Sequence, residues 1–224
     1  MEGRKVIIID LETGGFDEKV NPITQIAYEI LDLDSLTVID SYNEYIRPYK
    51  IDGKDPVLEQ NALNVSKITL ELLNKKGIDI EVALKQLIKD CERVNPNNRK
   101  SKFFSLNAPI LCAHNVAFEE KMLVYNYKLI NEDFNFFINS AKWDTQHFAE
   151  ARHPKDNKKV NLNACRDKED MPYEDAHNAM RDVEMTRELL VKWILLLRNS
   201  HVDNFEEKIT NSKKRTRSSF KFEI

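Results

Sequence analysis

Two acidic residues stand at the end of an apolar run near the start of the sequence. Residues 6–9 are continuous, apolar and β-branched, which predicts a strand buried on both faces. The run leads into DLETGG at residues 10–15, and Asp10 and Glu12 project together because residues two apart in a strand face the same way. Two such carboxylates repel one another unless a cation lies between them or water reaches them freely. A metal site and a solvated strand end closed by the Gly-Gly turn are both open at this point.

A second polar group, HNVAFE, occupies residues 114–119 directly after a short apolar stretch. The pattern predicts a strand that passes into a helix, with Asn115 as a plausible N-cap. Glu119 follows one turn later, on the same helical face as Asn115. We expect His114 to pack or hydrogen-bond beneath this segment.

A third group, HNAMRD, occupies residues 177–182 and is followed by Thr186. His177 and Asp182 are five residues apart, which is about 140° around an α-helix, so they would not share a face of one continuous helix. The spacing fits better if His177 precedes the helix, Asn178 caps it and Asp182 points from its second turn toward the first strand. A histidine in this place is more often a cap or a surface residue, but its spacing to Asp182 favours a functional role.

The three blocks DLETGG, HNVAFE and HNAMRDVEMT, in this order, resemble the three exonuclease motifs of the DEDDh (DnaQ-like) family of 3′–5′ exonucleases. This family includes polymerase proofreading subunits, ribonuclease T and oligoribonuclease. The similarity extends from Lys5 to about Leu197 and includes WDT at residues 143–145 and NLNAC at residues 161–165. It implies an α/β protein of the ribonuclease H-like fold, whose mixed five-stranded sheet combines a three-strand meander with parallel strands and is flanked by helices.

The resemblance also implies a function and a set of roles. The expected activity is metal-dependent 3′–5′ hydrolysis of phosphodiester bonds, which releases nucleoside 5′-monophosphates; DNA is the favoured substrate and RNA the second. Two Mg²⁺ or Mn²⁺ ions are the expected cofactors, because oxygen ligands suit these cations. Asp10 would bridge both ions, Glu12 and Asp182 would complete the first site, Glu119 would support the second, and His177 would be the general base. The substrate contacts would come from Leu11, Thr13, Gly14, Asn115 and Phe118.

One position departs from the family pattern. The second motif usually ends in aspartate, whereas this sequence has Glu119. Charge is kept and the side chain is longer by one methylene, so we expect an active enzyme that is slower or has a different metal preference. The alternative function is a catalytically impaired module of the same fold that binds nucleic-acid ends, and Glu119 is its only support.

The remaining elements follow from apolar periodicity and turn residues. Strands after the first are expected near residues 23–33, 36–46, 109–113 and 141–144, so that three consecutive strands form an antiparallel meander. Helices are expected within residues 56–94, with a break at Gly77, and over 116–130 and 179–197. The predicted exonuclease domain covers residues 1–200, and residues 201–224 form a basic tail expected to be flexible.

Composition limits the class of protein. The net charge of −3 argues against a general polyanion binder, although an enzyme can still hold a nucleic-acid backbone locally. No apolar run approaches the roughly 20 residues that span a bilayer, so no membrane association is expected. Three cysteines at unrelated spacings match neither a disulfide framework nor a zinc site, which favours a reducing, cytoplasmic location.

Two basic segments have both a structural and a functional interpretation. The loop that contains Arg99, Lys100, Lys102, Phe103 and Phe104 mixes cations with aromatics, as grooves for single strands do, but a solvated loop anchored by its two phenylalanines is favoured. The tail could contact phosphates or, through its alternating final residues 220–224, dock on a replication protein. Deletion of residues 208–224 that changed neither salt dependence nor partner binding would contradict both roles of the tail.

Overall fold

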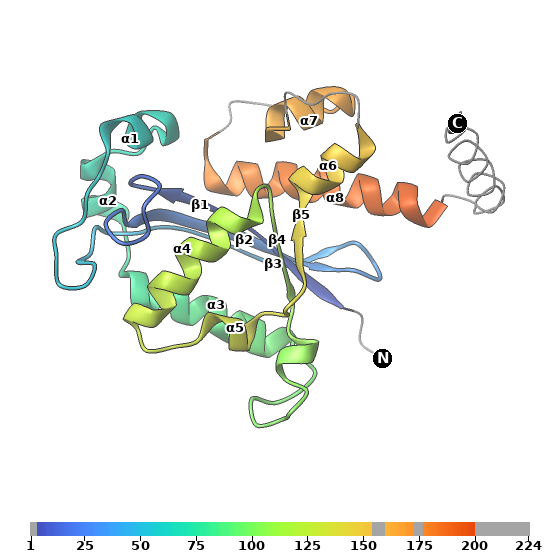
Figure 1. Cartoon of the computed structure of the whole chain (residues 1–224), viewed down its shortest axis with the longest axis horizontal. Coiled ribbons are helices and arrows are strands. Elements are labelled where there is room, and N and C mark those ends of the chain that lie inside the picture. Colours follow the sequence, from blue (N-terminus) through green and yellow to red (C-terminus); the bar gives the residue numbers. More distant parts are fainter. Residues whose placement is uncertain (1–3, 154–159, 173–176, 200–224) are drawn as a thin grey trace, which may run out of the picture. The chain divides into compact units, whose positions relative to one another are not determined.

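A mixed five-stranded sheet forms the centre of the computed structural model, which describes residues 4–153, 160–172 and 177–199 (Figure 1). The strand order is β3-β2-β1-β4-β5. The first three strands form an antiparallel meander, and β4 and β5 run parallel to β1. The strands are β1 Lys5–Thr13, β2 Ile23–Asp32, β3 Val38–Tyr45, β4 Ile110–Ala113 and β5 Lys142–Asp144. All five predicted strands and the predicted meander are confirmed, and β1 extends past the apolar run through both acidic residues.

The helices agree with the sequence pattern where they are long. Residues 56–94 hold three helices, because the chain breaks at Gly77, as predicted, and also at Lys67, which has a positive φ of 57°. Four short elements, η1, α5, α6 and α7, were not predicted. The bounds are α1 Gln60–Ser66, α2 Leu70–Lys76, α3 Ile80–Val94, η1 Ser105–Asn107, α4 Val116–Leu129, α5 Phe134–Phe137, α6 Thr145–Arg152, α7 Leu162–Lys168 and α8 Ala179–Asn199.

The two faces of β1 have different surroundings. Ile7, Ile9 and Leu11 belong to the large apolar cluster that also contains the buried side chains of α3, α4 and α5. The alternate residues, up to Asp10 and Glu12, face the other side, which α8 approaches. Helices therefore cover both faces of the sheet, and the apolar run is continuous because β1 is buried on both sides until its acidic end.

The chain divides into a compact unit of residues Met1–Leu190 and a second unit of residues Val191–Ile224. The last part of α8, residues 191–199, is the described portion of the second unit. The predicted basic tail 201–224 lies outside the described residues, so its proposed contacts stay predictions. No helix among the described residues combines the length and the apolar character that crossing a bilayer requires.

Candidate active site

Three carboxylates from distant parts of the sequence meet at the end of β1. Asp10 and Glu12 lie on one face of the strand, and Asp182 comes from the first turn of α8. One carboxylate oxygen from each of these three residues lies within 4.8 Å of the other two. A divalent cation can be held by oxygen atoms at this spacing. The structure thus brings together the three residues that the first and third sequence blocks single out.

The start of α8 explains how Asp182 reaches the cluster. The side chain of Asn178 accepts a hydrogen bond from the Arg181 amide at 3.3 Å, so Asn178 caps the helix as its sequence position predicts. His177 precedes the helix with a φ of 81° and is exposed. Its amide donates to Asp182 Oδ2 at 3.2 Å. This backbone bond ties the histidine to the carboxylate cluster, while leaving the imidazole outside the helix.

Glu119 approaches from a different side of the site. It lies in the first turn of α4 and is 4% exposed. It does not belong to the group of three within 4.8 Å, but its charge is among the causes that raise the pKa of Asp10. Its Oε2 is buried and has no hydrogen-bond partner within the described ranges, and the same is true of Asp182 Oδ1.

The N-terminus of α4 is capped by a residue that the sequence did not assign to it. Asn115 occupies the predicted N-cap position with a φ of 79°, but among the described residues its side chain makes no capping bond, so the position is confirmed and the side-chain capping is not. Asp144, at the end of β5, accepts instead from the amides of Asn115 at 3.0 Å and Val116 at 3.1 Å. It also accepts from the Gln146 amide at 2.9 Å and so caps α6. One buried carboxylate therefore fixes both helix starts, and its place in the WDT segment directly before a helix was a local signal for the cap of α6 alone.

His114 supports this junction. Its Nδ1 lies 2.9 Å from Thr145 Oγ1, and its Nε2 lies 2.6 Å from the Val160 carbonyl. Burial lowers the pKa of His114, which favours the neutral ring. With both ring nitrogens engaged, His114 is a structural residue beneath the second motif, as expected from the sequence.

The electrostatics of the cluster oppose charge on every member. Burial, followed by the charges of Glu119, Asp182 and Glu12, raises the pKa of Asp10 well above its usual value. Burial and the Asp182 charge raise the pKa of Glu12 to about 7. Burial is also the main cause that raises the pKa of Glu119 to about 8 and that of Asp182 above its usual value.

A divalent cation fits this arrangement. Positive charge would favour the ionised form of each carboxylate. Glu119 Oε2 and Asp182 Oδ1, which lack hydrogen-bond partners among the described residues, would gain a cation to bind. The donor atoms are all carboxylate oxygens, which suit Mg²⁺ or Mn²⁺ better than softer metals.

The Thr13–Gly14 segment is held tightly against the chain before α1. The Gly14 amide donates to the Pro22 carbonyl at 2.8 Å, and the Gly14 carbonyl accepts from the Glu59 amide at 2.7 Å. A Cβ on Gly14 would lie 2.9 Å from Leu58 and from the Val57 carbonyl, so close backbone packing explains this glycine. Leu11, in contrast, directs its side chain into the apolar core, which leaves only its backbone for the substrate contact predicted there.

An aromatic pair lies beside this segment. Phe118, in the first turn of α4, packs partly against the core and meets the ring of Phe16 edge-to-face, with centroids 6.0 Å apart. Phe16 is 77% exposed. Lys121 holds the backbone of Phe16 through its carbonyl at 2.7 Å. Phe16 was missed in the sequence, although an aromatic residue directly after the Gly-Gly turn was a usable signal.

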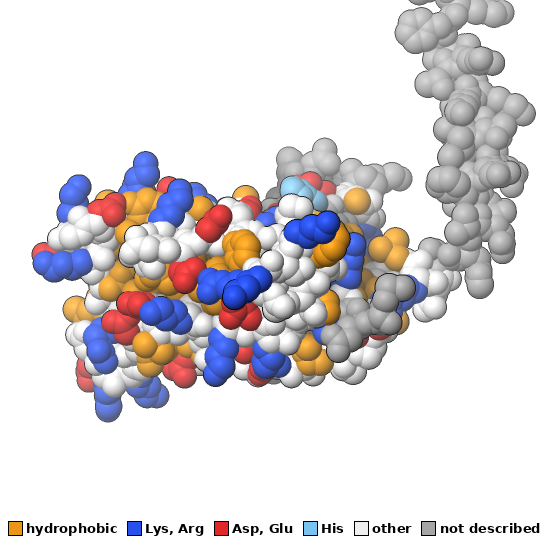
Figure 2. Space-filling view, turned by 90° about the horizontal axis from the view of Figure 1, so that it is seen from below, with side chains coloured by type: hydrophobic (Ala, Val, Ile, Leu, Met, Phe, Trp, Pro, Cys, Tyr) orange, Lys and Arg blue, Asp and Glu red, His pale blue; other side chains and the backbone are white. Residues whose placement is uncertain are grey.

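The basic loop after α3 agrees with the favoured interpretation of a solvated loop that phenylalanine anchors. Arg99 pairs with Glu92 at 3.4 Å and Glu132 at 3.0 Å. Phe104 is buried and anchors the loop, whereas Phe103 is 49% exposed, so one of the two phenylalanines serves as the anchor. Figure 2 shows a face of the molecule on which Lys and Arg side chains alternate with Asp and Glu, in line with the small net charge.

The sheet order and the flanking helices define an α/β protein of the ribonuclease H-like fold, as predicted. Among solved structures the chain is similar to exonuclease I, with a TM-score of 0.66 and 17% identity over 83% of this chain and 40% of that chain. An E. coli exonuclease I complex with a dT13 oligonucleotide gives a TM-score of 0.65 and 17% identity over 84% of this chain and 41% of that one.

Cell-death related nuclease 4 (CRN-4) is a further similar structure, with a TM-score of 0.66 and 17% identity over 87% of this chain and 65% of that chain. The chain thus spans about two fifths of exonuclease I and slightly less than two thirds of CRN-4. No protein-family model and no curated protein sequence matches it. Likeness at this level of identity establishes the fold alone.

Proposed function

We propose that this protein is a metal-dependent exonuclease that hydrolyses phosphodiester bonds from the 3′ end of a nucleic acid and releases nucleoside 5′-monophosphates. The observation that carries the proposal is the meeting of Asp10, Glu12 and Asp182, with one oxygen from each within 4.8 Å. Glu119, whose buried Oε2 lacks a hydrogen-bond partner among the described residues, adds a fourth carboxylate to a site that already disfavours negative charge. The fold of exonuclease I and CRN-4, both nucleases by name, supports the same class of reaction.

In this proposal Asp10, Glu12 and Asp182 would hold one divalent cation, and Asp10 with Glu119 would hold a second. When bound, such cations would supply positive charge for the phosphoryl group and for an attacking water. His177 would accept the proton of the attacking water on its imidazole. His177 is exposed directly before α8, and its amide is tied to Asp182.

The substrate end would lie along residues 13–16. The backbone at Leu11, Thr13 and Gly14 would meet the terminal nucleotide, and Asn115 would line the same side. Phe118 and the exposed Phe16 offer ring faces and edges on which unpaired bases stack, a contact that tolerates any base sequence. DNA is the favoured substrate, and RNA is the second possibility within the same activity.

An inactive module that binds nucleic-acid ends is the alternative, and it depends on Glu119 in place of aspartate. A protein of that kind has no need to gather four carboxylates at one site, where burial raises the pKa of each and neighbouring carboxylates add to the effect on Asp10, Glu12 and Glu119. The catalytic proposal accounts for this cluster, so we favour it.

The deciding experiment is digestion of 5′-labelled and 3′-labelled oligonucleotides, as DNA and as RNA, with Mg²⁺ or Mn²⁺. We expect a ladder of shortened 5′-labelled products and immediate release of the 3′ label as a mononucleotide. Asp10→Ala should remove both, while Asp90→Asn, a change to a buried carboxylate of α3, serves as the matched control and should keep them. Digestion that persists in the Asp10→Ala protein would refute the site, and binding without digestion in the unaltered protein would favour the end-binding module.

A further inference from the structure

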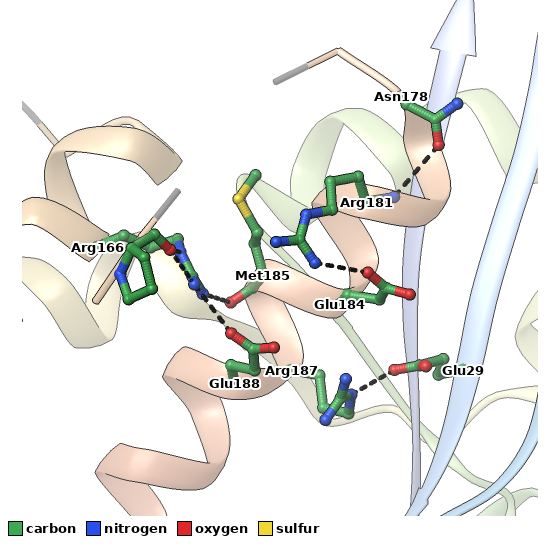
Figure 3. Close-up of polar contacts among 9 residues, drawn as sticks. Glu29, Arg166, Asn178, Arg181, Glu184, Met185, Arg187 and Glu188 are labelled. Carbon is green, nitrogen blue, oxygen red and sulfur yellow. Dashed lines mark hydrogen bonds and ion pairs between the residues drawn. The ribbon is translucent and has the colours of Figure 1, made fainter. Parts of the chain in front are cut away.

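A buried arginine ties α7 to α8 (Figure 3). Arg166 lies on α7 and is 1% exposed. Its Nη1 donates to the Met185 carbonyl at 3.2 Å, and its Nη2 pairs with Glu188 at 2.9 Å. Its Nε donates to the Pro172 carbonyl at 3.0 Å. The guanidinium therefore has partners on α8 and on the segment after α7.

Stability alone does not explain an arginine in this place. Removal of a guanidinium from water costs several kcal/mol as an order of magnitude, and apolar residues of similar volume often replace buried ion pairs without loss. Arginine differs from an apolar residue in the geometry that it imposes, because its planar donors hold several acceptors in fixed directions. The partners of Arg166 indicate which part of the molecule requires that geometry.

The contacts of Arg166 lie on α8 just beyond Asp182. Met185 is three residues further along and Glu188 six, so both are within two turns of Asp182 on the same continuous helix. Because a helix is stiff over this length, the two contacts fix its shift along the axis and its rotation together. A slip by one residue would move Asp182 by about 1.5 Å and turn it by about 100°. Such a slip would take the Asp182 carboxylate away from Asp10 and Glu12.

A second arginine holds the same helix against the sheet. Arg187 Nε donates to Glu29 Oε2 at 2.6 Å. Glu29 lies on β2 opposite Ile8, which is two residues before Asp10 and on the same face of β1. The helix is thus connected to β2 at Arg187 and to α7 at Met185 and Glu188, as Figure 3 shows.

We propose that Arg166 is a positioning residue that fixes α8 so that the Asp182 carboxylate stays within reach of a cation held by Asp10 and Glu12. The catalytic consequence rests on the proposed function, whereas the effect on metal binding can be measured without it. A role in stability alone would lower the free energy of unfolding and leave the metal affinity of the folded protein unchanged.

The experiment is titration of the metal-free full-length protein with Mn²⁺, with free Mn²⁺ followed by electron paramagnetic resonance. Arg166→Met keeps most of the side-chain volume and should weaken Mn²⁺ binding about tenfold, the lower end of the effect seen when residues that orient metal ligands are replaced. Arg166→Lys should recover part of the loss. Asp90→Asn removes the charge of a buried carboxylate on α3 and its ion pair with Arg93, and it should lower stability while leaving Mn²⁺ affinity unchanged.

Each outcome decides the proposal. Arg166→Met that folds cooperatively and binds Mn²⁺ like the unaltered protein would overturn it. Should Arg166→Met fail to fold, Glu188→Gln takes its place, because Glu188 is partly exposed; weaker Mn²⁺ binding in that variant supports the proposal and unchanged binding refutes it. An unaltered protein that binds no Mn²⁺ would also refute it, whereas one that binds Mn²⁺ and digests no nucleic acid would remove only the proposed function.

Discussion

Buried carboxylates in two regions of this protein have opposite surroundings. Asp90, on α3, accepts from the Tyr28 hydroxyl at 2.7 Å and from the side-chain Nε2 of Gln86 at 2.9 Å, and it pairs with Arg93 at 3.2 Å. At the end of β1, in contrast, Glu119 Oε2 and Asp182 Oδ1 are buried without a partner in the described part of the chain. A carboxylate whose oxygens are satisfied within the protein holds structure together, and one whose oxygens are not is suited to an external cation.

The largest effect should separate the two regions by activity. Asp10→Asn should lower exonuclease activity about a thousandfold or more, because loss of a shared metal ligand removes several kcal/mol of charge stabilisation at about 1.4 kcal/mol per tenfold. Asp90→Asn should stay within about a fewfold of the unaltered protein, since its partner Tyr28 belongs to the apolar cluster on the face of the sheet opposite Asp10. The measurement is the initial rate of release of a 3′ label at saturating Mg²⁺. Equal rates in the two variants would contradict the distinction between a metal-binding carboxylate at Asp10 and a structural one at Asp90.

The variants Asp10→Asn and Asp90→Asn should differ in the opposite direction in stability. Without metal, Asp10→Asn should raise the free energy of unfolding, because a neutral amide replaces a carboxyl whose ionisation is opposed by burial and by neighbouring carboxylates. Asp90→Asn should lower it by about 1–3 kcal/mol, because the amide keeps one acceptor oxygen but loses both the charge that strengthens these hydrogen bonds and the ion pair with Arg93. Urea unfolding in a chelator measures both. A loss of stability in metal-free Asp10→Asn would show that this carboxylate is structural as well.

The cluster should also make metal-free stability depend on pH. The pKa of Glu12 rises from 4.5 to about 7 on folding and that of Glu119 from 4.5 to about 8. Between these values the folded protein holds protons that the unfolded chain releases, so stability should fall as pH rises from about 4.5 to about 8, by up to about 1.4 kcal/mol per pH unit for each carboxylate. Unfolding in urea from pH 5 to 9 tests this decline.

Mn²⁺ and a variant provide the controls for the pH dependence. Protons compete with the cation for the same oxygens, so Mn²⁺ affinity should rise over this pH range and the decline in stability should shrink when Mn²⁺ is present. Glu119→Gln should flatten the part of the decline nearest pH 8. A flat stability profile in the metal-free protein would contradict the cause assigned to these pKa shifts.

Periodicity predicted what depends on local spacing. The β-branched run gave β1, alternation placed Asp10 and Glu12 on one face, and the five-residue step put His177 before α8. The missed features depend on contacts between segments far apart in sequence. The use of Asp144 as the cap of α4 follows from the pairing of β4 with β5, which no local pattern contains.

Arg166 and the short helices illustrate the same limit. A single arginine in a polar segment is typical of a surface residue, and its burial becomes visible only when α7 and α8 are adjacent. The helices α6 and α7 each begin at a side-chain cap, Asp144 and Asn161, but they are too short for apolar periodicity to mark them.

The aromatic pair allows a finer comparison beside the cluster. Phe16→Ala should weaken binding of single-stranded oligonucleotide by about 1–3 kcal/mol, the usual value for a base stacked on an aromatic side chain. Phe103→Ala, which removes an exposed ring of the loop after α3, should have no such effect. Fluorescence anisotropy with a labelled oligonucleotide and Ca²⁺ in place of Mg²⁺ measures both. Equal losses in the two variants would support the interpretation of the loop after α3 as a groove for single-stranded nucleic acid.

The smallest effect is expected at the position that departs from the family pattern. Glu119→Asp keeps the charge and shortens the side chain by one methylene, so the buried carboxylate should remain beside Asp10 and activity should stay within about tenfold of the unaltered protein. The rates with Mg²⁺ and with Mn²⁺ should change unequally, because these ions tolerate different ligand distances. Glu119→Gln, which removes the charge at nearly constant size, is the matched control and should lose far more. If the aspartate variant lost as much activity as the glutamine variant, the surroundings of Glu119 would be built around the longer side chain, and simple tolerance at this position would be wrong.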